Sequence, residues 1–321
     1  MTRTVSYIDK DIITLRLPDS VSFSILDSLI EETKKKYSNN KNAFNSIILD
    51  FSQIKYIDPE GALALICFCS AIKRKNENVN FHFVQPTESV LNYLKALGFF
   101  GQMSNKAGVI EIQDIVHYEN ELRHERRIRQ KKYSNQINLK SIILPIETIF
   151  QQMDSISGSD FENMVRTFVN NAIDSFAELF KSPHYNFNGE DQHDFLLSNV
   201  ELYKNIFEHS KSWGIASIHA RPNYGTTVCY YDIGIGFKAS VSKFDSELES
   251  IEWALIDGNS SKIGDDNDGF GLTIVQDFVL KRNGKIKIRS GDWLLQINST
   301  SKQKNKVTKF PGVQISYFIP I

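Results

Sequence analysis

Apolar positions in the first hundred residues follow the two-residue period of strands in some stretches and the longer period of helices in others. Runs of β-branched residues mark the strands, and amphipathic or wholly apolar runs mark the helices. The predicted elements alternate, as strand 11–17, helix 24–37, strand 46–51, helix 61–74, strand 79–84 and helix 89–97. Strands that alternate with helices at this spacing form an open sheet with helical crossovers, so we expect a small α/β domain here.

The second half of the chain carries its own set of patterns, which begins near residue 146. Helices are predicted at 160–180, 194–210 and 272–281, and strands at 215–220, 226–231, 285–290, 293–297 and 313–319. A charge-rich stretch at 117–134, basic in its second half, is typical of a solvated connector helix, with contact to a partner or to nucleic acid as the alternative. We therefore predict one domain at 1–116, a connector helix and linker at 117–145, and a second domain at 146–321.

Composition adds limits on partners and location. The 321 residues include 37 Lys and Arg against 38 Asp and Glu, so the net charge is close to zero. The electrostatic field of the whole protein therefore does not attract nucleic acid or an anionic membrane at long range. No apolar run is long enough to cross a bilayer, and the first residues lack the apolar core of a signal peptide, which favours a cytoplasmic protein. Three cysteines in apolar surroundings, Cys67, Cys69 and Cys229, favour reduced buried thiols over a disulfide or zinc site.

The N-terminal domain also has a family resemblance. The segments IILDFS at 47–52 and IDPEG at 57–61, with the ending LGF at 97–99, resemble a STAS domain, the anti-sigma antagonist fold, over about residues 5–105. Phosphorylated members of that family have a serine or threonine where this chain has Glu60. Glu60 is either an ordinary first-turn residue of a helix or a fixed negative charge in place of a phosphate.

Three segments of the second half form a further pattern, ELYKNIFEH at 201–209, DIGIG at 232–236 and DGFGL at 268–272. In this order they resemble the GHKL superfamily, which includes anti-sigma factors and histidine kinases. The resemblance implies the Bergerat fold, an α/β sandwich whose mixed sheet is covered by helices on one face, and it implies binding of ATP with Mg²⁺.

Side chains of the first segment recur every four residues and share a helix face, at Glu201, Asn205 and His209. The resemblance implies that Asn205 carries Mg²⁺ through its side-chain oxygen, which suits this ion, and that Glu201 is the catalytic base. His209 either lines the nucleotide pocket or is a hydrogen-bonded structural histidine.

The second segment supplies the implied base-recognition group, Asp232, which would accept the exocyclic amine of adenine. Gly234 and Gly236 follow it and leave room where the backbone approaches the base. The last strand departs from the family pattern, because Val313 stands after Gly312 where a threonine is common.

The third segment opens a helix. Glycines at a helix N-terminus expose backbone N–H groups to phosphate oxygens, and the implied phosphate contacts are Gly269, Gly271 and Leu272. The stretch 237–267 between the second and third segments would be the lid over the nucleotide. Lys262 within it is either a phosphate contact or a solvated lysine.

The predicted function is an ATP-binding regulator of the anti-sigma or partner-switching type, in which the nucleotide state controls contact with a STAS-like or sigma-factor-like protein. Two alternatives stay open, a serine/threonine kinase acting on a separate STAS-like protein and a non-catalytic scaffold that binds ATP. A histidine kinase is disfavoured, because a strand-like stretch at 142–145 follows His124 where a helical hairpin should continue. The family habit of pairing and the connector helix predict a homodimer.

Overall fold

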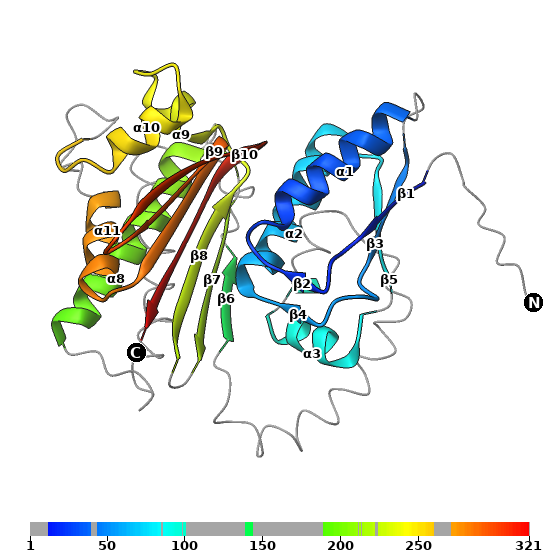
Figure 1. Ribbon diagram of the computed structural model, residues 1–321, viewed down its shortest axis with the longest axis horizontal. Helices are drawn as coiled ribbons and strands as arrows, with labels where there is room; N and C mark the ends of the chain where they lie inside the picture. The colour runs from blue at the N-terminus through cyan, green and yellow to red at the C-terminus, as the bar shows by residue number, and fades with distance from the viewer. Residues whose placement is uncertain are drawn as a thin grey trace, which may run out of the picture. The chain divides into compact units, whose positions relative to one another are not determined.

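The computed structural model describes residues 12–39, 44–84, 86–97, 99–100, 139–143, 189–210, 212, 214–221, 224–259 and 271–320. The chain divides into two compact units, Met1–Arg129 and Gln130–Ile321. The elements of both units are labelled in Figure 1. The predicted helices at 117–134 and 160–180 lie outside the described residues.

The first unit is an α/β fold with a parallel sheet, as the alternating pattern predicts. Its three main strands are ordered β1-β3-β5 and a short pair, β2 and β4, runs beside them. The elements in chain order are β1 (Ile12–Arg16), β2 (Ser20–Val21), α1 (Ile25–Asn39), β3 (Ser46–Asp50), β4 (Tyr56–Ile57), α2 (Pro59–Lys75), β5 (Asn80–Val84) and α3 (Glu88–Ala96). The six predicted elements are all present, and each end lies within two residues of its predicted position.

Helix α2 forms the centre of this unit. Every residue from Pro59 to Ala71 is buried, in agreement with a sequence that is apolar nearly all round. The helix begins where Oδ1 of Asp58 accepts the backbone N–H of Gly61 at 2.7 Å, and Pro59 occupies the first turn, where its missing N–H costs nothing. Cys67 and Cys69 lie on this helix and are buried, as their apolar surroundings predict.

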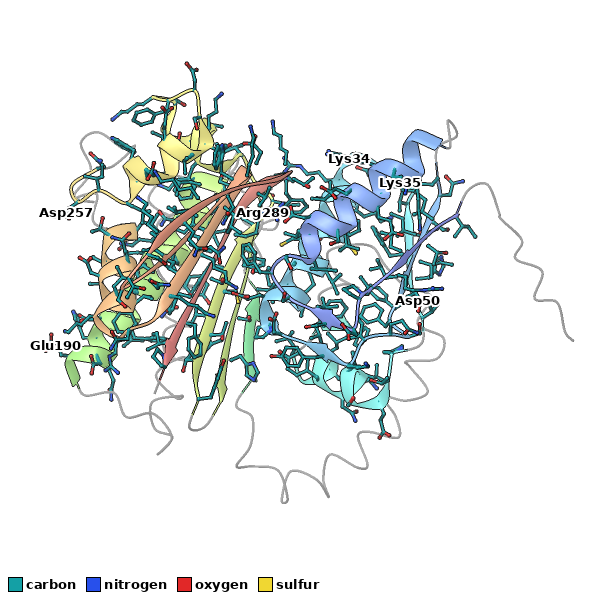
Figure 2. All side chains as sticks on the ribbon, viewed as in Figure 1. Lys34, Lys35, Asp50, Glu190, Asp257 and Arg289 are labelled. Atoms are coloured by element: carbon teal, nitrogen blue, oxygen red, sulfur yellow. The ribbon has the colours of Figure 1, made fainter. Side chains whose placement is uncertain are left out.

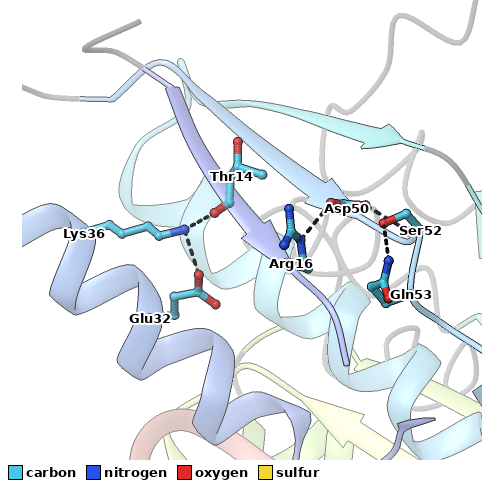
Figure 3. Close-up of polar contacts among 7 residues, drawn as sticks. All are labelled: Thr14, Arg16, Glu32, Lys36, Asp50, Ser52 and Gln53. Atoms are coloured by element: carbon cyan, nitrogen blue, oxygen red, sulfur yellow. Dashed lines mark hydrogen bonds and ion pairs between the residues drawn. The ribbon is translucent and has the colours of Figure 1, made fainter. Parts of the chain in front are cut away.

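The carboxyl edge of the parallel sheet carries a small polar network (Figure 3). Nε of Arg16, at the end of β1, donates to Oδ2 of Asp50 at 3.3 Å, and Oδ1 of Asp50 accepts the backbone N–H of Ser52 at 2.9 Å. Partial burial raises the pKa of Asp50, but the hydrogen bonds from Ser52 and Arg16 outweigh it, so the pKa lies below its ordinary value.

The second unit contains a five-stranded sheet with the order β6-β7-β8-β10-β9. Its elements are β6 (Leu139–Ile143), α8 (Gly189–Asn205), the π-helical turn η1 (Ile206–Ser210), β7 (Gly214–Arg221), β8 (Gly225–Asp232), α9 (Gly236–Val241), α10 (Glu247–Ala254), α11 (Gly271–Lys281), β9 (Lys285–Asn298) and β10 (Lys302–Pro320). Figure 1 shows α8 and α11 side by side on one face of this sheet.

Two expectations for this unit are corrected. The described strands pair only in the antiparallel sense, not as a mixed sheet, because β7 and β8 and then β9 and β10 follow one another as hairpins. Helix α8 begins at Gly189, five residues before the predicted start at 194. Strand β6 pairs with β7 and belongs to this sheet, although its residues fall in the sequence-predicted linker.

A buried amide fixes α8 against the sheet. The side chain of Asn199 is fully buried; its Oδ1 accepts the hydroxyl of Tyr230 at 2.7 Å and that of Tyr317 at 3.2 Å. Its Nδ2 donates to the carbonyl of Phe195 at 2.6 Å. Because buried polar groups are costly unless paired, this network selects one rotation of α8 and so determines which of its residues face the sheet.

Ion pairs hold the start of α8 to the end of α11. Arg282 pairs with the buried carboxylate of Asp191, with Nε donating to Oδ1 at 3.0 Å. Lys281 pairs with the exposed Glu190, labelled in Figure 2, at 2.7 Å. These ion pairs therefore fix α8 and α11 to each other at one end. The candidate site residues lie at the other end of both helices. Among the described residues, no helix is both long enough and apolar enough to cross a membrane.

Candidate functional site

The candidate site is built where α8 ends. Glu201 lies on the last turn of α8 and Asn205 is its final residue, and both side chains are half-buried. The chain then widens into the π-helical turn η1, a local geometry that is frequent at functional sites. Within η1, Nδ1 of the half-buried His209 lies 3.0 Å from Oγ of Ser240 on α9, so the histidine joins the end of α8 to the segment that follows β8.

The carboxylate of Glu201 reaches the start of α11. A Cβ atom at Gly271 would lie 2.8 Å from Oε2 of Glu201, so the glycine leaves the space that the carboxylate occupies. The other oxygen, Oε1, accepts a hydrogen bond from Nζ of Lys204 at 3.1 Å. The first and third sequence segments, about seventy residues apart, therefore meet at Glu201 and Gly271.

The second segment adjoins the end of the first. Gly234 lies so close to η1 that a Cβ atom there would stand 1.9 Å from the carbonyl oxygen of Ser210. The backbone N–H of Ile235 donates to that same carbonyl at 3.0 Å. The turn after β8 and the end of η1 are thus in direct backbone contact, and no side chain longer than hydrogen fits between them.

Asp232, the last residue of β8, is buried with 4% of its surface exposed. Its Oδ1 accepts the backbone N–H groups of Gly234 at 2.7 Å and Val313 at 3.2 Å. Burial raises the pKa of Asp232 to about 7, although these two hydrogen bonds act in the opposite direction. A buried carboxyl whose pKa is raised toward neutrality is a candidate for a functional role.

Residues of β10 complete the surroundings of Asp232. A Cβ atom at Gly312 would lie 2.2 Å from the carbonyl oxygen of Asp232, and Nε2 of the buried Gln314 donates to that oxygen at 3.1 Å. Val313, noted in the sequence as a departure from the family pattern, contributes its backbone N–H and not its side chain. No sequence pattern indicates Gln314, because one buried glutamine in a strand has no diagnostic spacing.

The remaining predicted site residues divide into two groups. Leu272 is buried in the first turn of α11, and Gly236 begins α9 with φ of +82°, a conformation that favours glycine. Lys262 and Gly269 lie outside the described residues. Of the ten predicted site residues, the structure describes eight, on the end of α8, the turn after β8 and the start of α11.

In the first unit, Glu60 lies in the first turn of α2, directly after Pro59, and 8% of its surface is exposed. A negative charge is favourable at this end of the helix under both readings of Glu60, as a first-turn residue or as a replacement for a phosphate.

Comparison with known families assigns the first unit. Residues 4–116 match the family model of the STAS domain, which confirms the resemblance drawn from the segments at 47–52 and 57–61. The N-terminal third of the chain is therefore a STAS domain. The match does not extend into the second unit, and a search of curated proteins returned no match to the chain.

Proposed function

We propose that the second unit is a GHKL-type domain that binds ATP with Mg²⁺. The observation that carries this proposal is the contact of three sequence segments that are far apart in the chain: Glu201 lies against Gly271, and Ser210 lies against Gly234. An arrangement of helix end, strand end and helix start around one place is what a ligand site of this type requires. The antiparallel sheet with α8 and α11 on one face is compatible with this fold.

In this proposal Asp232 recognises the base. One of its oxygens is already used by two backbone N–H groups, which fix the plane of the carboxyl. The other would accept the exocyclic amine of adenine. Guanine carries a carbonyl at that position, so the same carboxylate would select ATP over GTP.

The proposed phosphate end lies beside Glu201 and Asn205. Asn205 has a side-chain oxygen, the type of ligand that Mg²⁺ prefers, and would hold the ion that accompanies the phosphates. When bound, Mg²⁺ would neutralise phosphate charge. Glu201 would take a proton from the attacking water or hydroxyl, and the backbone at the start of α11 would face phosphate oxygens through Gly271 and Leu272.

The STAS domain is consistent with regulation by partner switching. We propose that the nucleotide state of the second unit changes which protein partner is bound, with a STAS-like or sigma-factor-like regulator as the partner class. The partner could also receive the phosphoryl group on a serine, and the label experiment below separates this from hydrolysis.

Incubation of the purified protein with Mg²⁺ and γ-labelled ATP, with and without candidate partner proteins, tests the chemistry. We expect released phosphate or label on a partner's serine, and Glu201→Ala should lower either rate by about a hundredfold or more while ATP still binds. Glu190→Ala, at the far end of α8, is the matched control and should leave the rate unchanged. Equal rates in the parent protein and Glu201→Ala would exclude Glu201 as the base, and ATP binding without turnover would indicate a scaffold.

A further inference from the structure

Two side chains from other elements hold the chain just after the Asp232 turn. The backbone N–H of Phe237 donates to Oγ of Ser290 on β9 at 3.0 Å. The next N–H, that of Lys238, donates to Oε2 of Glu247 at 3.0 Å. The two acceptors are themselves joined, because Oγ of Ser290 donates to the same oxygen of Glu247 at 2.7 Å.

The carboxylate of Glu247 is enclosed by two glycines. A Cβ atom at Gly236 would stand 2.9 Å from Oγ of Ser290 and 3.2 Å from Oε1 of Glu247. A Cβ atom at Gly291 would stand 2.7 Å from Cγ of Glu247. Both glycines have positive φ, at +82° and +55°, so the backbone on each side is shaped to admit this side chain.

Glu247 therefore connects three parts of the unit: the turn after β8, strand β9 at Ser290 and Gly291, and the start of α10, of which it is the first residue. Ser246 caps that helix by accepting the backbone N–H of Leu248 at 3.2 Å, so Glu247 itself does not serve as the cap. Its carboxylate is directed instead to the backbone beyond Gly236.

We infer that Glu247 is a positioning residue for the adenine end of the site, and this inference rests on the proposed function. The N–H groups of Gly234 and Ile235 are held by Asp232 and Ser210, and those of Phe237 and Lys238 by Ser290 and Glu247. Glu247 thereby fixes the far side of the turn whose near side carries the base-recognition carboxylate. Groups that hold a binding residue in place have effects on affinity although they do not touch the ligand.

Glu252 provides a matched control on the same helix. It is also a glutamate that ties α10 to the β9–β10 hairpin, through Lys302 at 2.7 Å and Lys304 at 2.8 Å, but it makes these contacts away from the turn. Glu247→Gln keeps the size of the side chain and removes an oxygen acceptor and the charge. Glu252→Gln makes the same chemical change where only the hairpin is affected.

The test is titration calorimetry of Mg²⁺–ATP binding to the full-length wild type, Glu247→Gln, Ser290→Ala and Glu252→Gln, well below each unfolding temperature. Hydrogen exchange of the Phe237 and Lys238 amides without nucleotide is measured in parallel. We expect Glu247→Gln and Ser290→Ala to weaken ATP binding by about tenfold and to speed exchange at these amides. Glu252→Gln should change affinity by less than about twofold.

The outcomes separate the two proposals. If the wild type binds ATP and Glu247→Gln binds it equally well, the positioning role is wrong and the proposed function stands. An equal loss of affinity in Glu252→Gln would also overturn it, because the effect would then belong to α10 as a whole. If the wild type does not bind ATP, the proposed function fails, and the nucleotide role of Glu247 fails with it.

Discussion

Two aspartates end buried strands in the same local geometry, one in each unit. Asp50 ends β3 and Asp232 ends β8, and in both the Oδ1 atom accepts the backbone N–H two residues later, from Ser52 at 2.9 Å and from Gly234 at 2.7 Å. Their pKa values nevertheless move in opposite directions, lowered for Asp50 and raised to about 7 for Asp232.

Surroundings explain the difference. The side chain of Asp50 is partly exposed and is joined by the guanidinium of Arg16, whereas Asp232 is buried and receives hydrogen bonds from neutral backbone groups. A carboxyl group in the second situation costs free energy in its charged form. The hydrogen bonds and the ion pair of Asp50 are sufficient to explain its turn. In the turn of Asp232 the charged carboxylate is unfavourable, and a role in function would explain why the protein has an aspartate there.

The largest expected effect is on the pH dependence of stability. The folded pKa of Asp232 lies above its unfolded value of 3.8, so its contribution to stability is full below about pH 4 and is lost as pH rises through about 7. The loss amounts to at most about 4 kcal/mol. Asp232→Asn removes this titration. Between pH 4 and pH 8 the variant should lose less stability than the wild type, as measured by urea unfolding with tryptophan fluorescence, since all three tryptophans lie in the second unit.

Parallel pH profiles for the wild type and Asp232→Asn would contradict the raised pKa. Asp50→Asn is the control for this comparison. It should leave the tryptophan-detected profile of the second unit unchanged.

The next largest effect, on the free energy of unfolding, is expected when the residue two positions after Asp232 is changed to the one that stands two positions after Asp50. Gly234→Ser places a serine two positions after Asp232, as Ser52 stands after Asp50, but its Cβ would stand 1.9 Å from the carbonyl oxygen of Ser210. We expect a loss of about 2 to 3 kcal/mol in the free energy of unfolding, measured by urea denaturation. Gly189→Ala is the matched control, because no atom lies within 4 Å of a Cβ there. Equal stabilities of the two variants would show that the contact with Ser210 is not as close as described.

The smallest effect is expected in the STAS domain. Arg16→Met removes an exposed partner of Asp50 and should change the free energy of unfolding by less than about 1 kcal/mol. In this variant the pKa of Asp50 should rise toward its ordinary value. As the solution is acidified, the stability that Asp50 contributes at neutral pH would therefore be lost at a higher pH in the variant than in the wild type. Carboxyl-carbon NMR titration of Asp50 would measure this shift, and an unchanged pKa would remove Arg16 from the explanation.

The fold of the first unit could be predicted because each of its elements has a clear local pattern. The parallel strands are short apolar runs, and α2 is apolar on all sides as a buried helix must be. The second unit was harder. The first half of β10, rich in lysine at 302, 304, 306 and 309, has no apolar alternation because most of it is exposed, so the sequence predicted only 313–319.

Prediction of the site had a similar limit. Glu201, Asp232 and Gly271 could be named as candidates because they stand in short motifs with fixed spacing. Ser290 and Glu247 were not, because their contact joins residues 43 apart and depends on how α10 packs beside β9. The meeting of Gly234 with Ser210 follows from a π-helical turn that no local pattern indicates.

The most direct test of the account is calorimetric titration of the wild type and Asp232→Asn with Mg²⁺–ATP and Mg²⁺–GTP at pH 8, where Asp232 is largely ionised. We predict that the wild type binds ATP and prefers it to GTP, and that Asp232→Asn weakens ATP binding by about tenfold to a hundredfold, the value of one hydrogen bond to a charged group. Wild-type protein that binds neither nucleotide, or a variant that binds ATP as tightly as the wild type, would contradict the assignment of Asp232 as the centre of an adenine site.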